Sequence, residues 1–142
     1  MQTIRQILQN KGGSIWSVTP NETVYDAVRK MAEKGIGALL VLDDGELHGM
    51  MSERDYARKV ILEGKASRDT LVGTICSSPA ITISPGASAQ EGLALMTNKR
   101  FRHLPVVDEG ELLGVVSIGD LVDVVLGEQQ EMIEQLERYV SG

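Results

Sequence analysis

Leu39-Leu-Val-Leu-Asp-Asp-Gly-Glu-Leu-His-Gly49 is followed 65 positions later by Leu104-Pro-Val-Val-Asp-Glu-Gly-Glu-Leu-Leu-Gly114. The alignment of the chain with itself needs no gap. It also places identical residues opposite each other outside these stretches: Pro20 and Pro85, Met31 and Met96, Ser52 and Ser117, Asp55 and Asp120. Similarity at one fixed period indicates a duplicated structural unit. The sequence therefore predicts two copies of one unit.

Each copy predicts the element order β-α-β-β-α. A first strand ends at Pro20 or Pro85, and a helix follows the capping boxes Thr23-Val-Tyr-Asp26 and Ser88-Ala-Gln-Glu91. Two apolar runs joined by Asp-Asp-Gly or Asp-Glu-Gly predict a hairpin. We expect buried strands at 38–42 and 104–107 and return strands at 47–51 and 112–116. The second helices should begin at Ser52 and Ser117. Their buried stripes are predicted to be Tyr56, Ala57, Val60 and Ile61 in the first copy and Leu121, Val122, Val125 and Leu126 in the second.

Further helices frame the two copies. Short helices are expected at 3–9, anchored by Ile4 and Leu8, and at 70–76, anchored by Leu71 and Ile75. A final helix at 128–140 carries an apolar stripe that must bury against this chain or against a partner. The stripe comprises Met132, Ile133, Leu136, Tyr139 and Val140, and the acids Glu128, Glu131, Glu134 and Glu137 form a solvated face. The predicted domains are 1–66, 67–127 and 128–142.

Composition limits the classes of function. The 142 residues and 42% apolar content suit one compact module, and a net charge of −6 disfavours phosphate-backbone binding to nucleic acid. The longest apolar run, 38–42, is too short to cross a membrane, and the first residues lack the apolar core of a signal peptide. A single cysteine, Cys76, allows no internal disulfide. We expect a cytoplasmic protein with no membrane or nucleic-acid partner.

The most informative motif occurs where each return strand ends. Gly49-Met-Met-Ser52-Glu-Arg-Asp55 and Gly114-Val-Val-Ser117-Ile-Gly-Asp120 resemble the Gly-hydrophobic-x-Ser/Thr-x-x-Asp motif of CBS domains, as do Arg102-His-Leu-Pro-Val-Val-Asp108 and Thr82-Ile-Ser-Pro85 in other parts of that pattern. The resemblance covers about 1–127 and implies a tandem CBS pair, or Bateman module. This α/β fold has two pseudo-symmetric units and two clefts for adenosine-containing ligands, and such modules usually pair as disc-shaped dimers.

The Ser-x-x-Asp spacing has two interpretations. It describes a helix N-cap with a carboxylate at N3, and the same spacing occurs at Thr23/Asp26 and Ser88/Glu91, where we assign capping alone. At Ser52 and Ser117, however, a strand leads directly into a helix, so free N–H groups and the positive helix end would face a ligand. The glycines leave room for a ligand or a neighbouring backbone, the serine can donate to a phosphate, and the aspartate can accept both hydroxyls of a ribose.

In the family, each cleft combines the motif of one unit with the first strand and the pre-Leu-Pro segment of the other. The resemblance places site A at Gly49, Met50, Ser52, Arg54, Asp55, Ile81, Arg102, His103 and Pro105. It places site B at Trp16, Gly37, Ala38, Gly114, Val115, Ser117 and Asp120. Ile81 and Trp16 are matching positions where the family sets side chains against adenine, although Trp16 can equally be a core residue.

The two predicted sites differ in charge. Arg54, Arg102 and His103 could gather near a phosphate in site A, whereas the matching positions in site B, namely Gly119, Gly37 and Ala38, carry no charge. Because arginine pairs with phosphate through a rigid fork, site A is expected to prefer the more negative nucleotides. Arg54 and Arg102 can instead be solvated surface charges.

The predicted function is binding of AMP, ADP, ATP or NAD(H) as an energy or redox sensor that acts through a homodimer or an unknown effector protein. One alternative is a dimerisation or docking scaffold with vestigial sites. An enzyme such as a nucleotide hydrolase is disfavoured, because the sequence lacks a metal-ligand cluster, a nucleophile–base pair and a Walker motif. We therefore predict no catalytic residue, no metal and no catalytic cofactor, and Cys76 is expected to be an unreactive residue at a helix end.

Overall fold

The computed structural model describes residues 1–12 and 15–141 and divides the chain into two compact units. The middle unit is Ile15–Ile81, and the terminal unit combines Met1–Ser14 with Thr82–Gly142. The domain boundaries predicted from the repeat follow chain order and so differ from these packed units. The difference arises from the two short leading helices described below.

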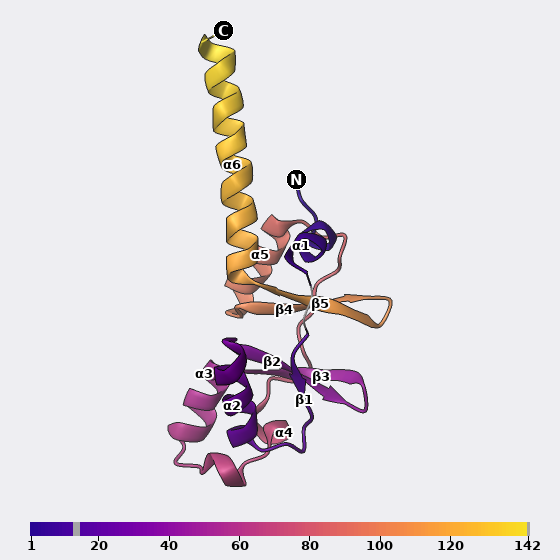
Figure 1. Ribbon diagram of the computed structural model, residues 1–142, viewed down its shortest axis with the longest axis vertical. Coiled ribbons are helices and arrows are strands. Elements are labelled where there is room, and N and C mark those ends of the chain that lie inside the picture. The colour runs from indigo at the N-terminus through magenta and orange to yellow at the C-terminus, as the bar shows by residue number, and fades with distance from the viewer. Residues whose placement is uncertain (13–14, 142) are drawn as a thin grey trace. The chain divides into compact units, whose positions relative to one another are not determined.

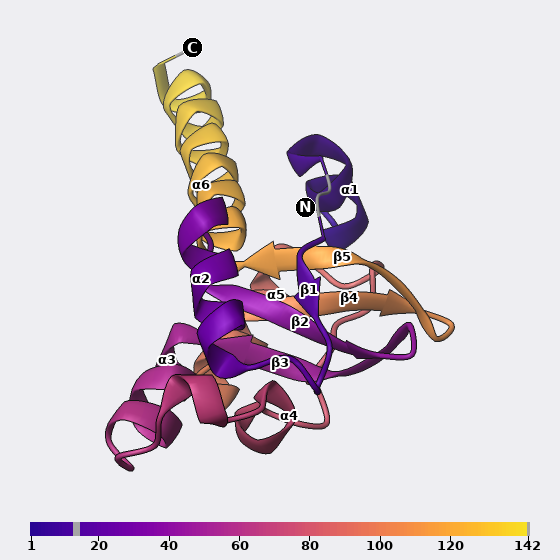
Figure 2. The same cartoon turned by 60° about the horizontal axis from the view of Figure 1, so that its bottom comes forward.

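The middle unit contains the first copy of the repeat. Its sheet has the order β1-β2-β3, with β1 parallel to β2 and β2 antiparallel to β3. Helices α2 and α3 contact each other and lie against β2 and β3, respectively (Figure 2). The elements are β1 (Ser17–Val18), α2 (Val24–Lys34), β2 (Ala38–Asp43), β3 (Glu46–Ser52), α3 (Glu53–Tyr56) continued by a π-helical turn (Ala57–Ile61), a 3₁₀ turn (Ser67–Asp69) and α4 (Val72–Ile75).

The terminal unit contains the second copy together with the N-terminal helix. Strands β4 and β5 form an antiparallel pair, and α5 and α1 contact α6. Figure 1 shows the second half of α6 extending away from α1 and α5. The elements are α1 (Ile4–Lys11), α5 (Ala89–Lys99), β4 (His103–Asp108), β5 (Glu111–Ser117) and α6 (Ile118–Ser141).

The leading helix of each copy packs in the unit of the other copy. At the start of α1, the Ile4 N–H donates to the Ala87 carbonyl at 2.9 Å. At the start of α4, the Val72 N–H donates to the Glu22 carbonyl at 2.9 Å. These backbone bonds hold α1 against the second copy and α4 against the first.

Both hairpins confirm the predicted turns. Asp44 and Gly45 have φ values of 53° and 83°, and Glu109 and Gly110 have 50° and 80°. Two consecutive positive φ values match the twist of a two-residue hairpin turn, and glycine takes the second position without a Cβ penalty.

The prediction of a strand before Pro85 is wrong in length, because the structure has only one parallel bridge there, between Ile83 and Val106. In the first copy the Leu40 N–H donates to the Trp16 carbonyl at 3.1 Å, which extends β1. The position matching Leu40 is Pro105, which has no N–H to donate. One ladder bond is therefore unavailable in the second copy.

The predicted strands 38–42 and 104–107 are buried or half-buried as expected, whereas several predicted helix positions are corrected. Ten buried residues form the core of the middle unit: Val18, Val24, Ala27, Met31, Leu39, Val41, Met51, Val60, Val72 and Ile75. Leu71 was wrong as an anchor, because it precedes α4 as its N-cap residue and is exposed, and Val72 is buried instead. In α1, Ile7 rather than Leu8 is fully buried beside Ile4. Residues predicted to be buried in the second helices but found exposed are Ala57, Ile61, Val122 and Leu126.

The predicted separate helix at 128–140 is the second half of α6, which runs unbroken from Ile118 to Ser141. Glycine in an exposed helix interior costs only about 1 kcal/mol, so Gly127 alone does not end the helix. Just beyond it, Glu128 accepts hydrogen bonds from the Gln2 N–H at 2.6 Å and the Gln90 side chain at 3.1 Å. These bonds fix the helix to the terminal unit immediately after Gly127.

Candidate ligand-binding corners

Each unit has one corner at which a strand leads directly into a helix. The middle corner joins β3 to α3 at Ser52, and the terminal corner joins β5 to α6 at Ser117. In the middle corner, Asp55 N–H donates to Ser52 Oγ at 3.2 Å, and Ser52 N–H donates to Asp55 Oδ2 at 2.9 Å. The same pair of bonds joins Ser117 and Asp120 at 3.2 and 2.8 Å. Both motifs are therefore reciprocal capping boxes, which confirms their predicted capping role.

The carboxylate of the middle corner has many partners within its own unit. Asp55 Oδ2 also accepts from Ser52 Oγ at 3.1 Å, while Oδ1 accepts from Ser77 Oγ at 3.3 Å and pairs with Lys59 Nζ at 3.1 Å. Its side chain is 13% exposed. Because a carboxylate accepts about four hydrogen bonds, these contacts leave Asp55 little capacity for a ligand.

The terminal corner is built differently, around a lysine from α1. Lys11 Nζ lies 2.7 Å from Asp120 Oδ2 and 3.0 Å from the Val115 carbonyl oxygen. The side chains of Lys11 and Asp120 are 38% and 24% exposed. Asp120 thus accepts from the Ser117 N–H, the Lys11 ammonium and the Ser117 hydroxyl. Because a carboxylate accepts about four hydrogen bonds, it retains capacity for a hydroxyl donor.

Lys11 also determines the protonation of the terminal corner. Burial alone would raise the pKa of Asp120, but the hydrogen bonds from Lys11 and from the Ser117 N–H, together with the charge of Lys11, outweigh burial and lower that pKa. A lowered pKa keeps the carboxylate ionised, which is the state that accepts hydrogen bonds.

The motif glycines accommodate neighbouring groups of the same unit. A Cβ on Gly49 would lie 2.4 Å from the Ser77 carbonyl oxygen, and a Cβ on Gly114 would lie 2.9 Å from Leu8 Cδ2. The close approach of a neighbouring backbone is thus confirmed for Gly49. Ser77 N–H donates to the Met50 carbonyl at 2.8 Å, and at the matching position Lys11 Nζ donates to the Val115 carbonyl. An ammonium in one copy therefore replaces a backbone N–H in the other.

The first backbone N–H of each helix donates a hydrogen bond to a carbonyl group of the same unit. Glu53 N–H donates to the Gly37 carbonyl at 3.0 Å, and Ile118 N–H donates to the Arg102 carbonyl at 2.8 Å. The next residue, Gly119, is exposed and has no side chain that could cover the helix N-terminus. The start of α6 beside Ser117 is therefore accessible from solvent at the terminal corner.

Several predicted site residues lie beside the corner of their own unit. Ala38 pairs with Ser52 in the β2–β3 ladder, and His103 pairs with Ser117 in the β4–β5 ladder. Arg102 precedes this strand and is exposed, and Pro105 is buried opposite Val115. The combination of these residues with the motif of the other copy stays a prediction.

Trp16 is half-buried against the core of the middle unit. Lys34 Nζ lies 4.3 Å from the centroid of its ring, within the range of a cation–π interaction. The ammonium covers one ring face, so these contacts favour the core interpretation of Trp16. Ile81 is half-buried and Arg54 is exposed at the start of α3.

Sequence reasoning missed the cations that contact the two carboxylates. Lys59 follows Asp55 by four residues on a helix, a spacing that could have been recognised. Lys11 reaches Asp120 only because α1 packs with the second copy, and nothing local in the sequence indicates that contact. The positions of site B that match Arg54, Arg102 and His103 carry no charge, but Lys11 places a cation beside the motif of site B.

Clusters of metal ligands and the single cysteine bear on other kinds of site chemistry. Within residues 1–12 and 15–141, no three His, Cys, Asp or Glu side chains gather as a metal site would require, and no helix is long and apolar enough to span a bilayer. Cys76 is half-buried, and burial, followed by the charge of Asp55, raises the pKa of its thiol. A raised pKa lowers the thiolate fraction, which makes Cys76 a poor nucleophile.

Comparison with known proteins identifies the family. The CBS domain model matches residues 10–62 and 72–127, so the chain belongs to the CBS domain family and carries a CBS pair, in general a regulatory module. The fold expected from the resemblance is thereby confirmed.

Three similar proteins illustrate the relationship. A putative signal-transduction protein with CBS domains from Burkholderia ambifaria superposes with a TM-score of 0.86 at 49% identity, covering 90% of this chain and 96% of that chain. The mitochondrial CBS domain-containing protein CBSX3 of Arabidopsis thaliana is 39% identical over 99% of this chain and 72% of its own length. A hexameric CBS-CP12 protein from bloom-forming cyanobacteria has a TM-score of 0.75 at 26% identity over 84% of this chain and 70% of its own.

Proposed function

We propose that the chain is a non-catalytic sensor that binds an adenine nucleotide or dinucleotide, such as AMP, ADP, ATP or NAD(H), and reports energy or redox state. The observation that carries the proposal is the terminal corner. Its carboxylate is ionised and retains acceptor capacity, the exposed Gly119 leaves the start of α6 accessible, and the Lys11 ammonium contacts the carboxylate. The carboxylate can accept hydrogen bonds from the ribose hydroxyls of a nucleotide, and the helix N-terminus and the ammonium can bind its phosphate.

The corners are unequal in this proposal. Ser52 Oγ donates to Asp55, and Asp55 also holds Ser77 and Lys59, so a ligand at the middle corner must displace existing bonds. At the terminal corner, Asp120 can accept from a ribose while Lys11 stays in place. We therefore assign the tighter nucleotide site to the corner with Asp120.

The test compares two capping boxes of the terminal unit. Asp120→Ala removes the carboxylate at the corner, and Glu91→Ala removes the corresponding carboxylate of the Ser88 box, whose two bonds measure 3.1 and 3.3 Å. Glu91→Ala should lower stability by about 1 kcal/mol, and Asp120→Ala by about 2 kcal/mol, because it also removes the ion pair with Lys11. By calorimetry, only Asp120→Ala should weaken AMP and NAD binding, by roughly tenfold, which corresponds to the loss of about one charge-assisted hydrogen bond. Equal binding by both variants would reduce Asp120 to a cap.

We also propose that the chain assembles as a homodimer, through which a bound nucleotide acts on an effector protein. Support comes from the hexameric CBS-CP12 relative and from the exposed apolar residues of α6. Light scattering at micromolar concentration would contradict the dimer if it gave the mass of one chain.

A further inference from the structure

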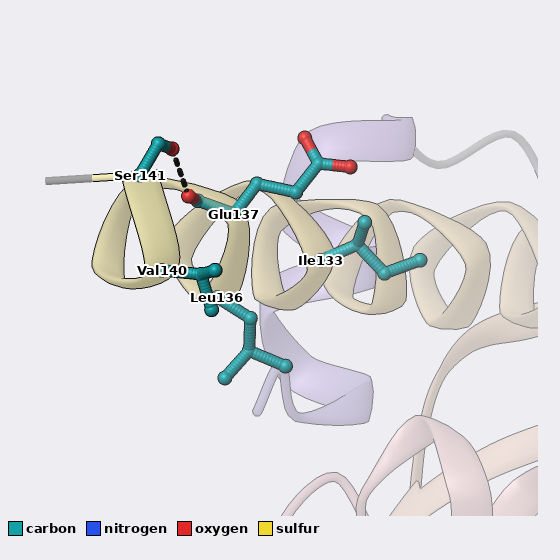
Figure 3. Close-up of a pocket in the computed structure, with 5 residues that line it drawn as sticks. All are labelled: Ile133, Leu136, Glu137, Val140 and Ser141. Carbon is teal, nitrogen blue, oxygen red and sulfur yellow. Dashed lines mark hydrogen bonds between the residues drawn. The ribbon is translucent and has the colours of Figure 1, made fainter.

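The second half of α6 exposes apolar residues that its own unit does not cover. The helix continues about 20 Å beyond Glu128 at 1.5 Å per residue. Met132, Ile133 and Leu136 are 63%, 48% and 59% exposed, and Tyr139 and Val140 exceed 80%. Figure 3 shows Ile133, Leu136 and Val140 projecting from the last turns, where they line a shallow depression with Glu137 and Ser141.

These apolar residues follow a heptad pattern. With Leu126 at position a, the a positions are Leu126, Ile133 and Val140, the d positions are Val122, Gln129 and Leu136, and the g positions are Val125, Met132 and Tyr139. We call the a and d residues the α6 seam. Spacings of alternately three and four residues are typical of coiled coils.

The seam points away from the unit that carries α6. The c positions Leu121 and Glu128 face that unit: Leu121 is fully buried, and Glu128 accepts from Gln2 and Gln90. At 3.6 residues per turn, the c position lies about 130° around the helix axis from the middle of the a/d edge. Packing within the unit therefore leaves the seam exposed.

The charges around the seam favour a second copy of the chain in parallel orientation. Glu128, Glu131 and Glu134 occupy c, f and b, outside the contact, although each copy has a net charge of −6. In a parallel pair, the acidic e residues Asp123 and Glu137 face apolar g residues of the other copy. An antiparallel pair would place Asp123 opposite Glu137, and like charges there would repel.

The polar seam residue fits the same arrangement. In a parallel pair with matched register, Gln129 faces its own counterpart, and each side-chain amide can donate to and accept from the other. A polar residue at a single core position commonly fixes register in coiled coils. We propose that the α6 seam forms a parallel, in-register coiled coil with a second copy of this chain. This inference names the contact surface of the proposed homodimer and does not depend on any ligand.

Cysteine cross-linking of the full chain tests this surface. In a Cys76→Ser background, Leu136→Cys places a thiol at d, whereas the matched Glu134→Cys places one at b, outside the contact. A disulfide needs Cα atoms within about 7 Å. Under mild oxidation, we expect Leu136→Cys to form covalent dimers at least about tenfold faster than Glu134→Cys, as the proposed parallel geometry requires. Equal rates would overturn the proposal, as would an antiparallel pair, in which position 136 lies far from its counterpart.

Sedimentation of the double variant Ile133→Glu, Leu136→Glu provides a second readout, with Glu134→Gln as control. These side chains are exposed in the isolated chain, so circular dichroism should show an intact fold. We expect the double variant to dissociate at concentrations where the wild type and the control remain paired. If the double variant has the same mass as the wild type, self-association does not use the seam and the proposal fails, whether or not the protein still dimerises elsewhere.

Discussion

Replacement of Lys11 by methionine removes the ammonium of the terminal corner and keeps most of the side-chain volume. In the structure Nζ contacts Asp120 Oδ2 at 2.7 Å and the Val115 carbonyl at 3.0 Å, and both side chains are partly exposed. Exposed ion pairs contribute up to about 1 kcal/mol. Because Asp120 is the more buried partner, we expect a loss near that upper value at neutral pH, measured by chemical denaturation.

This loss should depend on pH with a definite sign. The folded protein lowers the pKa of Asp120, so the stabilisation is present above the unfolded pKa of about 4 and is lost as the pH falls through the folded value. Without Lys11, burial is less well opposed and the pKa of Asp120 rises. The stability difference between the wild type and Lys11→Met should therefore be full at pH 7 and shrink below about pH 4.

The same variant tests phosphate recognition. Two unit charges 4 Å apart interact by about 4 kcal/mol at an effective dielectric of 20, before desolvation and screening reduce the net value. A net remainder near 1 kcal/mol corresponds to about fivefold in affinity. By calorimetry, Lys11→Met should lose about fivefold for AMP relative to adenosine, and high salt should reduce the difference.

Arg5 on the same helix supplies the control. Its guanidinium pairs with Asp108 at 3.3 Å, so Arg5→Met also removes one cation of α1 without altering the Asp120 pair. Arg5→Met should leave the preference for AMP over adenosine unchanged. The reasoning is refuted if Lys11→Met and Arg5→Met discriminate AMP from adenosine equally well.

Three further predictions follow from the contacts of the two corners. Gly49→Ala should destabilise by about 1–3 kcal/mol and more than Gly114→Ala, because a Cβ on Gly49 meets a hydrogen-bonded backbone whereas Leu8 can change rotamer; equal denaturation midpoints would contradict this. Asp55→Ala should reduce AMP affinity less than Asp120→Ala, since Asp55 is already saturated by its own unit, and the reverse order by calorimetry would refute the assignment. Cys76 should react with a thiol reagent at pH 7 more slowly than free cysteine, because its thiol pKa is raised; an equal rate would contradict the contribution of burial.

The elements that the sequence predicted correctly are those determined by local patterns. Both hairpins follow from apolar runs that flank an acidic residue and a glycine, and the helix after Ser52 follows from its capping box. The duplication supplied a second, independent example of each pattern.

The features that could not be predicted from the sequence depend on contacts between segments that are distant in the chain. The crossing of α1 to the second copy is fixed by backbone bonds such as that from Ile4 to Ala87, and only this crossing brings Lys11 to Asp120. The strand before Pro85 is reduced to one bridge because Pro105 has no N–H to donate to it. The repeat did not indicate this loss, because the position matching Pro105 in the first copy is Leu40, which does have an N–H. The continuity of α6 through Gly127 similarly depends on the hydrogen bonds of Glu128.

Native mass spectrometry of the freshly purified chain tests the central claim most directly, because it reports bound nucleotide and oligomeric state in one spectrum. The account predicts a dimer that carries an adenosine-containing ligand, or that takes one up when AMP, ATP or NAD is added at millimolar concentration, and that releases it intact on denaturation. A ligand-free spectrum that none of these nucleotides changes would contradict it.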